Sequence, residues 1–150
     1  SFFYLPVCSC YPVLYFKGVP EKYQPGAWVR RANWHEMTDE EMISYYAGLA
    51  KKYGGQITAY YQNAICLVMG KNEIYTLADQ SLHSEEFIIS SKPHKMRTKG
   101  YPLDSLSVHI ESGKFYMDLK PDTAHSYVLK KDLSEGFRRF FIQSIGARKI

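Results

Sequence analysis

The feature that most constrains the fold is a capped amphipathic helix followed at once by a long apolar run. Thr38 is a good N-cap residue, and Glu41, three residues later, can return a hydrogen bond to the cap, which is the capping-box arrangement. Apolar and aromatic residues then recur at a spacing that places them on one helix face, namely Met42, Tyr45, Tyr46, Leu49 and Tyr53. Because Gly54 and Gly55 can adopt the left-handed conformation that ends a helix, the pattern predicts a helix from about Thr38 to Tyr53.

The run after this helix predicts a central β-strand. Residues 57–69 alternate between apolar and polar at first and are then continuously apolar over 64–68, as in strands that are covered on both faces. A turn at 70–73 follows, and residues 74–77 are expected to pair antiparallel with the strand before it.

The remaining elements complete an α/β pattern. Residues 87–90 are a further strand candidate, and the alternation of Leu106, Val108 and Ile110 predicts a short strand ahead of a turn at 112–114. Residues 129–145 carry an apolar helical stripe that Gly136 weakens. We therefore predict an α/β fold, a layered mixed sheet with flanking helices, in a single domain over residues 1–150.

Composition bounds the class of protein and its partners. Among 150 residues, 45% are hydrophobic, which can supply the core of one domain, and a formal net charge of +4 permits an anionic partner. Cys8, Cys10 and Cys66 lack the second pair or the histidines of a zinc site, so reduced thiols and a cytoplasmic location are expected. Prolines interrupt the apolar start, and neither a signal peptide nor a membrane span is predicted.

Three short strings follow one another along the chain. Residues 25–30 read Pro-Gly-Ala-Trp-Val-Arg, residues 100–104 read Gly-Tyr-Pro-Leu-Asp, and residues 113–119 begin with Gly-Lys and end with Asp-Leu. In this order they resemble the non-canonical purine nucleoside triphosphate pyrophosphatases, the family that includes the inosine triphosphate pyrophosphatases. The first string is similar to the family's proline-glycine turn with an aromatic and a basic residue after it, the second stands where the family has a glycine-aromatic-glycine-aromatic-aspartate loop, and the third resembles its Gly-Lys-Thr segment that ends in Glu-Leu. The match covers about residues 14–119 and corresponds to the carboxyl-terminal portion of the family.

The resemblance implies an incomplete inosine triphosphate pyrophosphatase-like fold and a specific activity. Family members use Mg²⁺ to hydrolyse inosine and xanthosine triphosphates, and their deoxy forms, to a monophosphate and pyrophosphate. A homodimer is also expected, since half of such a sheet would leave an edge unpaired. The alternative is an inactive nucleotide-binding or dimerising remnant. A basic RNA-binding domain is a weaker interpretation, because the sequence lacks an aromatic ribonucleoprotein string and a GXXG clamp.

By resemblance, the loop at 100–104 binds the purine. Tyr101 would stack on the ring, Leu103 would line the pocket, and Asp104 would accept a hydrogen bond from the ring N–H that hypoxanthine has and adenine lacks. The other interpretation of Asp104 is an aspartate that caps a turn before Ser105. The basic loop at 92–99 leads into this region and either attracts phosphates or is an ordinary solvated loop. A proton-transfer role for His94 lacks a visible partner in the sequence.

The sequence departs from the family at both ends. Residues 1–13 match it poorly and contain neither the Asn-x-x-Lys phosphate loop nor the acidic residues that hold Mg²⁺, so no catalytic or metal-binding residue is identified. The family's closing Ser-His-Arg has only Ser134 as a counterpart, within Ser-Glu-Gly, and that register places Lys130 on the family's lysine position. Ser134 and Lys130 are thus substrate-binding candidates by resemblance, although Lys130 and Lys131 also suit a helix surface.

Overall fold

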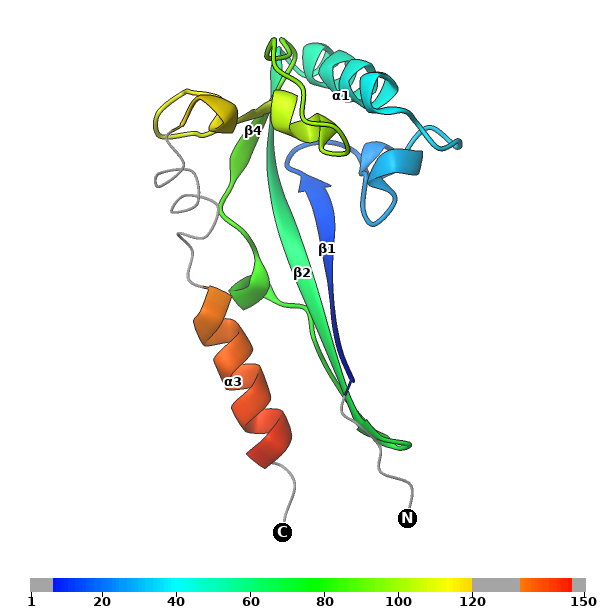
Figure 1. Ribbon diagram of the computed structural model, residues 1–150, viewed down its shortest axis with the longest axis vertical. Helices are drawn as coiled ribbons and strands as arrows, with labels where there is room; N and C mark the ends of the chain where they lie inside the picture. The colour runs from blue at the N-terminus through cyan, green and yellow to red at the C-terminus, as the bar shows by residue number, and fades with distance from the viewer. Residues whose placement is uncertain (1–6, 120–132, 147–150) are drawn as a thin grey trace.

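The computed structural model describes residues 7–119 and 133–146 of the chain. They form an elongated α/β molecule in which one long strand joins a broad end to a narrow end (Figure 1). In chain order the strands and helices are β1 (Val7–Phe16), α1 (Asp39–Lys52), β2 (Gln56–Gly70), β3 (Glu73–Leu77), β4 (Phe87–Ser90), β5 (Ser107–Val108) and α3 (Leu133–Gly146). Short 3-10 turns lie between them: η1 (Glu21–Tyr23), η2 (Val29–Arg31), η3 (Gln80–Leu82), η4 (Pro102–Ser105) and η5 (Tyr116–Asp118).

The predicted capping box starts α1. The Thr38 hydroxyl accepts a hydrogen bond from the Glu41 backbone N–H at 3.3 Å, and the Glu41 carboxylate accepts one from the Thr38 N–H at 2.7 Å. Gly54 and Gly55 follow the helix with φ angles of 91° and 101°, and the Gly55 N–H donates to the Ala50 carbonyl at 2.9 Å. These glycines end the helix as predicted, because residues with a side chain rarely adopt such angles.

β2 is the strand around which the sheet is built. One of its edges pairs with β1 from Ala59 to Val68. Its other edge pairs with β4 over residues 56–59 and with β3 over residues 65–70. β5 adds to the far side of β4 and is limited to two residues, so the strand predicted around Leu106–Ile110 is shorter than its alternating pattern indicates. The predicted layered α/β arrangement is confirmed. A mixed sheet was expected, but among the described strands every pairing is antiparallel.

Residues 7–13, which match the family poorly in sequence, are continuous with the rest of the sheet. They pair in register with β2 from Val7↔Val68 to Val13↔Gln62. β1 is therefore one uninterrupted strand whose first residues belong to the narrow end and whose last residues belong to the broad end (Figure 1).

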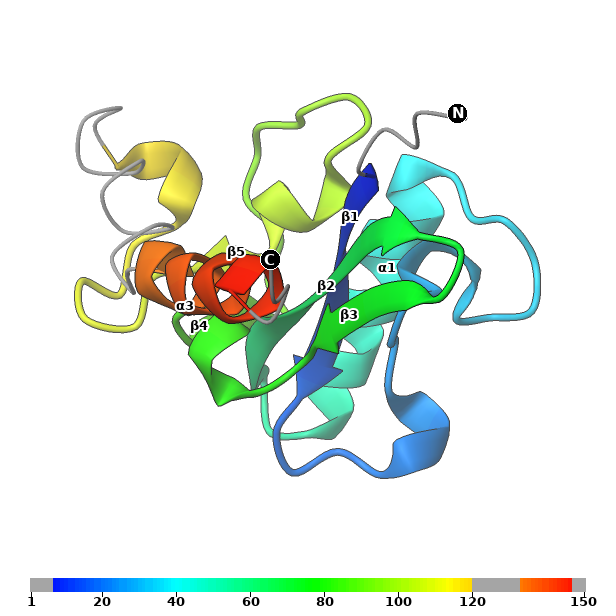
Figure 2. The same ribbon diagram turned by 90° about the horizontal axis from the view of Figure 1, so that it is seen from below.

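Two apolar cores lie at the two ends of β2. At the broad end α1 and η4 cover β1, β2 and β4, and the buried side chains include Leu14, Phe16, Tyr46, Ile57, Ala59, Ile89, Leu103 and Leu106. At the narrow end α3 and η3 cover the other half of β2, with Ile65, Leu67, Leu82 and Phe140 buried together. Figure 2 shows α3 lying against one side of β2 and β3 at this end. No helix within the described ranges is long and apolar enough to cross a membrane.

Gly136 has a packing role that its sequence context conceals. The sequence predicts it as a weak point in the last helix, but it is buried where α3 meets η3. A Cβ atom at this position would lie 2.9 Å from the Ser81 carbonyl oxygen and 3.0 Å from a methyl group of Leu82. The absence of a side chain therefore permits the close approach of helix and turn that buries Phe140.

This contact predicts opposite effects for two glycine-to-alanine changes. Alanine is favoured over glycine in a helix interior by about 1 kcal/mol, so Gly48→Ala, at an exposed α1 position with no atom within 4 Å, should raise the free energy of unfolding by up to that amount. Gly136→Ala should lower it, because the added methyl group meets backbone. Denaturant unfolding of the two variants measures the difference, and equal stabilisation by both would contradict the close packing of α3 on η3.

Candidate functional site

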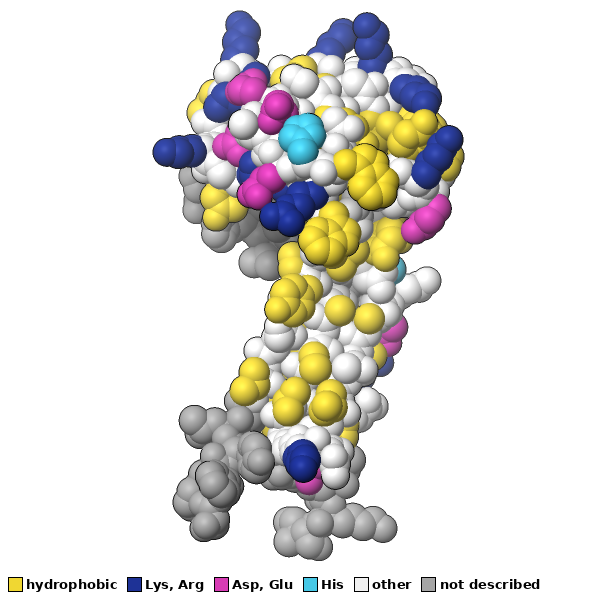
Figure 3. All heavy atoms as spheres, turned by 90° about the vertical axis from the view of Figure 1, so that its right-hand side faces the viewer, with side chains coloured by type: hydrophobic (Ala, Val, Ile, Leu, Met, Phe, Trp, Pro, Cys, Tyr) yellow, Lys and Arg dark blue, Asp and Glu magenta, His cyan; other side chains and the backbone are white. Residues whose placement is uncertain are grey.

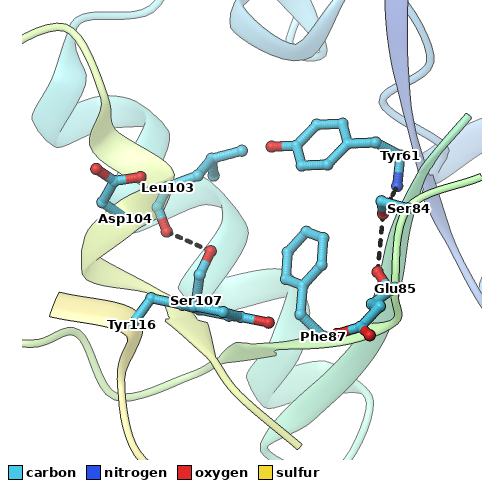
Figure 4. Close-up of a pocket in the computed structure, with 8 residues that line it drawn as sticks. All are labelled: Tyr61, Ser84, Glu85, Phe87, Leu103, Asp104, Ser107 and Tyr116. Carbon is cyan, nitrogen blue, oxygen red and sulfur yellow. Dashed lines mark hydrogen bonds between the residues drawn. The ribbon is translucent and has the colours of Figure 1, made fainter. Parts of the chain in front are cut away.

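A pocket of about 180 Å³ opens where β2, β4, β5, η4 and η5 meet (Figure 4). Eight residues line it: Tyr61, Ser84, Glu85, Phe87, Leu103, Asp104, Ser107 and Tyr116. They come from four stretches of the chain, at residues 61, 84–87, 103–107 and 116, so the pocket exists only in the folded chain. A cavity of about 150 Å³ suffices for a benzene ring. The pocket therefore matches a planar aromatic group the size of a single base rather than a whole nucleotide.

Three aromatic rings form the apolar wall. Tyr61 and Phe87 are stacked, with ring centroids 5.5 Å apart and planes inclined by 24°. Tyr116 meets Phe87 edge-on, with centroids 6.5 Å apart. Tyr61 is placed by strand alternation, which turns it to the same face of β2 as the buried Ile57 and Ala59. Such rings offer a flat aromatic ligand both stacking and edge contacts.

The serine hydroxyls of the pocket are engaged with backbone. Ser84 Oγ accepts from the Tyr61 N–H at 2.8 Å and donates to the Glu85 carbonyl at 2.8 Å, and Ser107 Oγ donates to the Leu103 carbonyl at 2.8 Å. The Asp104 carboxylate differs from them, since it makes no side-chain hydrogen bond or ion pair with any other residue in 7–119 or 133–146. A turn-capping aspartate would accept a hydrogen bond from a nearby backbone N–H, and the Asp104 carboxylate accepts none from the described residues.

Electrostatics divide the polar groups of the pocket into an acceptor and two donors. The surrounding protein removes water from the Asp104 carboxyl group and raises its pKa above the ordinary value. Burial, and then the negative charge of Asp104, raise the pKa of Tyr61. Burial and the nearby Glu85 raise the pKa of Tyr116 to about 12. Both phenols thus keep their protons at neutral pH and present O–H donors. In Figure 4 the Tyr61 hydroxyl points toward the turn that carries Leu103 and Asp104.

The structure brings only part of the predicted set of site residues together. Leu103 and Asp104 lie on η4 and line the pocket. Tyr101 precedes that turn, is 66% exposed and lies outside the lining residues. Ser134 is exposed on α3, which packs at the narrow end of the molecule, and Lys130 lies outside the described residues. The aromatic wall of Tyr61, Phe87 and Tyr116 was not predicted from sequence, because strand periodicity marks Tyr61 and Phe87 simply as core positions.

His94 joins the two turns that carry the polar walls. Its backbone N–H donates to the Ser105 carbonyl at 2.7 Å, at the end of η4. Its ring Nδ1 accepts from the Met96 N–H at 3.0 Å, so the neutral ring carries its proton on Nε2, which lies 3.1 Å from the Asp118 carboxylate on η5. The side chain is only 17% exposed and packs against the Phe115 ring at 5.0 Å. His94 therefore braces η4 against η5.

The basic loop at 92–99 is anchored on the start of α1. Arg97 Nε donates to the Glu40 carboxylate at 2.8 Å, and the Asp39 carboxylate accepts from the Gly100 N–H at 2.7 Å. Asp39 is also paired with Arg30 at 2.9 Å. The Gly100 N–H and then the Arg30 guanidinium hold the pKa of Asp39 below its ordinary value. These contacts hold the loop that leads into η4 against the first turn of α1.

The described residues do not fit the Mg²⁺ ion that the family resemblance implies. Within 7–119 and 133–146 no three Asp, Glu, His or Cys side chains gather closely enough to hold a metal ion. Of the acidic residues near the pocket, Asp118 is already paired with His94. Glu85 and Asp104 both line the pocket but lie on different segments of the chain.

Comparisons with known proteins give matches in structure but not in sequence. The chain matches no protein-family model and no curated protein. Its fold is similar to a HAM1 protein from Coxiella burnetii, with a TM-score of 0.66 and 18% identity over 93% of this chain and 68% of the other. The Staphylococcus aureus Ham1 protein gives a TM-score of 0.59 and 15% identity over 91% and 66%. A nucleoside-triphosphatase or dITP/XTP pyrophosphatase from Mycobacterium abscessus gives 0.62 and 14% over 89% and 66%.

These matches extend over about nine tenths of this chain and over about two thirds of each solved structure. The predicted fold class is confirmed by them. The chain therefore has the fold of the HAM1 proteins and dITP/XTP pyrophosphatases, in partial form.

Proposed function

We propose that this chain binds a purine base in the Asp104 pocket and forms the base-recognition part of a pyrophosphohydrolase. The reaction would convert inosine and xanthosine triphosphates, and their deoxy forms, to a monophosphate and pyrophosphate. The fold and the ordered sequence strings support this assignment. The observation that carries it is the Asp104 carboxylate, which has no hydrogen-bond partner among the described residues and borders an aromatic pocket the size of one base.

The chemistry of that carboxylate accounts for the proposed choice of base. An ionised carboxylate only accepts hydrogen bonds, and the ring N–H of hypoxanthine or xanthine is a donor at the position where adenine has an acceptor. The rings of Tyr61 and Phe87 would contact the base through its faces and edges, and the two phenolic O–H groups would donate to its carbonyl oxygens. Tyr101 and Ser134 lie outside the pocket lining and stay substrate-binding candidates by resemblance alone. The pocket is too small to enclose the ribose and the phosphates of a nucleotide.

Hydrolysis of the triphosphate needs more than recognition of the base. Phosphoryl transfer depends chiefly on positioning and on neutralising charge at the phosphates, for which the family uses Mg²⁺. The described residues offer no set of ligands for that ion. For the described residues taken by themselves, this observation favours the second candidate function, a nucleotide-binding domain that does not hydrolyse its ligand.

The test is binding without turnover. Purified chain should bind inosine triphosphate measurably by calorimetry but release no pyrophosphate above background across a magnesium series, since base recognition and phosphate chemistry reside in different residues. Adenosine triphosphate is the matched ligand control and should bind more weakly. Absence of any preference for inosine triphosphate would refute base recognition, whereas robust magnesium-dependent hydrolysis would refute the separation of binding from catalysis.

A second prediction concerns Asp104 and pH. As pH falls through the raised pKa of this carboxyl group, it gains a proton and becomes able to donate to adenine, so the preference for inosine over adenosine triphosphate should narrow. Above that pKa the preference should stay constant. Asp104→Asn should reduce it by about one to two powers of ten at neutral pH and remove its pH dependence.

Glu111→Gln is the matched control for Asp104→Asn, because it removes a carboxylate from an exposed turn outside the pocket. It should leave both the preference and its pH profile unchanged. If Asp104→Asn behaves like this control in a chain that prefers inosine triphosphate, Asp104 does not read the base.

The brace formed by His94 gives a third prediction. His94→Ala removes the hydrogen bonds to Met96 and Asp118, and at about 1 kcal/mol for each it should lower the free energy of unfolding by about 2 kcal/mol. It should also weaken binding of inosine triphosphate, because η4 and η5 both carry residues that line the pocket. His35→Ala, at a half-exposed histidine outside the pocket, is the control and should change neither quantity. Additive effects of His94→Ala and Asp118→Ala in a double-mutant cycle would show that the two residues act independently.

A further inference from the structure

Both tryptophans of the chain lie on one exposed surface of the broad end. Trp28 and Trp34 are the two tryptophans in the sequence, and they flank η2. Trp28 is 67% exposed and Trp34 is 99% exposed. Together with Arg31 and Ala32 they line an open cavity of about 360 Å³, which we call the tryptophan site. Large indole rings are thus presented to solvent on either side of a guanidinium group.

The backbone at Trp34 is strained, and no burial of its ring offsets the strain. Trp34 has a φ angle of 65° and is the only non-glycine residue with a positive φ among residues 7–119 and 133–146. Bulky side chains rarely adopt this conformation. The turn is held by two backbone hydrogen bonds, from the Trp34 N–H to the Arg31 carbonyl at 3.0 Å and from the Met37 N–H to the Arg30 carbonyl at 2.9 Å. Strain of this kind gathers at sites that bind ligands.

The basic loop lies next to the tryptophan site. The Arg30 side chain donates to the Met37 carbonyl at 2.9 Å and pairs with the Asp39 carboxylate at 2.9 Å. The other oxygen of Asp39 accepts from the Gly100 N–H at 2.7 Å, directly after the basic loop. The charge of Lys99 joins the Gly100 N–H and Arg30 in lowering the pKa of Asp39. η2 and the end of the basic loop therefore meet at one carboxylate.

Positive charge remains on this surface after its ion pairs are formed. Three carboxylates are each paired with an arginine at 2.8 to 3.1 Å: Glu36 with Arg31, Asp39 with Arg30 and Glu40 with Arg97. Lys95 and Lys99 form no ion pair in the described part of the chain. Segments 28–41 and 92–99 together contain six basic and four acidic residues. Figure 3 looks onto this side of the molecule and shows Lys and Arg side chains around exposed hydrophobic ones on the broad end.

We propose that the tryptophan site binds single-stranded nucleic acid, with bases stacked on Trp28 and Trp34 and phosphates held by Arg31 and the basic loop. Every base has a flat face that can stack on an aromatic ring, and a neighbouring basic surface attracts the backbone. This mode of binding tolerates any sequence, so it needs none of the RNA-binding motifs that the chain lacks. The Arg31–Glu36 pair is no obstacle, because an exposed ion pair is weak and a guanidinium binds phosphate well.

Charge is the reason for choosing this ligand over others that stack on tryptophan. A cationic ligand would be repelled by Arg31 and by the lysines of the basic loop, whereas a neutral peptide or sugar would gain nothing from them. A duplex is a poorer ligand than a single strand, because its bases already stack on each other. The tryptophan site shares no lining residue with the Asp104 pocket, so the proposal does not depend on base recognition there.

Intrinsic fluorescence provides the measurement, because both tryptophans of the chain belong to this surface. A single-stranded thymidine oligonucleotide of about ten residues should quench the fluorescence saturably. If about two or three phosphates are contacted, the affinity should fall about tenfold when the salt concentration rises about fourfold. A duplex of the same length should quench it less. Replacing both Lys95 and Lys99 by Gln should reduce the salt dependence, because fewer phosphates are then neutralised.

Trp34→Ala is the decisive variant. The side chain is almost fully exposed, so its removal should leave the free energy of unfolding unchanged while it weakens oligonucleotide binding about tenfold, measured by the anisotropy of a labelled oligonucleotide. Trp34→Phe keeps a ring for stacking and should retain most of the affinity. Tyr11→Ala is the matched control, since it removes a ring as exposed as that of Trp28, 68% against 67%, from the narrow end. It should leave binding unchanged, and so should Asp104→Asn, which separates this site from the pocket.

Several outcomes would overturn the proposal. One is the absence of saturable quenching by the oligonucleotide, and another is equal affinity of the unaltered chain and Trp34→Ala. Stronger quenching by a proline-rich peptide or a neutral oligosaccharide than by the oligonucleotide would assign the tryptophan site to another class of ligand. Salt dependence that stays the same without Lys95 and Lys99 would show that the phosphates do not reach the basic loop.

Discussion

The rest of the structure depends on the hydrogen bonding of β2 along both of its edges. Over most of its fifteen residues β2 has β1 on one side, and on the other side it has β4 first and β3 later. A strand of this length buries its backbone polar groups only if partners are supplied along the whole of it. The two apolar cores are consequences of the same strand, since α1 covers one end of its inward face and α3 covers the other.

The pocket lies where the second edge of β2 changes partner. β4 pairs as far as Ala59 and β3 begins at Ile65, and between them the segment before β4 lies against β2. Here the Ser84 N–H donates to the Tyr61 carbonyl and Ser84 Oγ accepts from the Tyr61 N–H, which replaces the missing ladder. The side chain of Tyr61 then faces space that no strand fills, and Phe87, η4 and η5 enclose it. A break in the sheet is thus used to place a base-sized cavity beside a carboxylate.

Strand alternation makes β2 serve two surfaces at once. Tyr61 lines the pocket, whereas its neighbour Tyr60 points to the other side of the sheet and stacks on Tyr15. His94 provides a separate restraint on the far wall, because it ties η4 to η5 from outside the pocket. The fold is similar to that of the HAM1 structures. The residues that carry the proposed chemistry lie on strands and on turns, and the packing of these strands and turns against each other forms the pocket.

The sequence by itself determined the elements whose signals are local. The capping box of α1, the glycines that end it, the extent of β2 and the hairpin to β3 all follow from neighbouring residues, and all are found in the structure. The sequence also pointed to Leu103 and Asp104 through a resemblance in order and spacing. Only the tertiary structure decided that Tyr61, Phe87 and Tyr116 line one pocket with Asp104, that Tyr101 lies outside it, and that Gly136 is required by a contact with Ser81. Periodicity shows which side of a strand or helix is apolar, but the partner that covers that side is set by the packing of segments far apart along the chain.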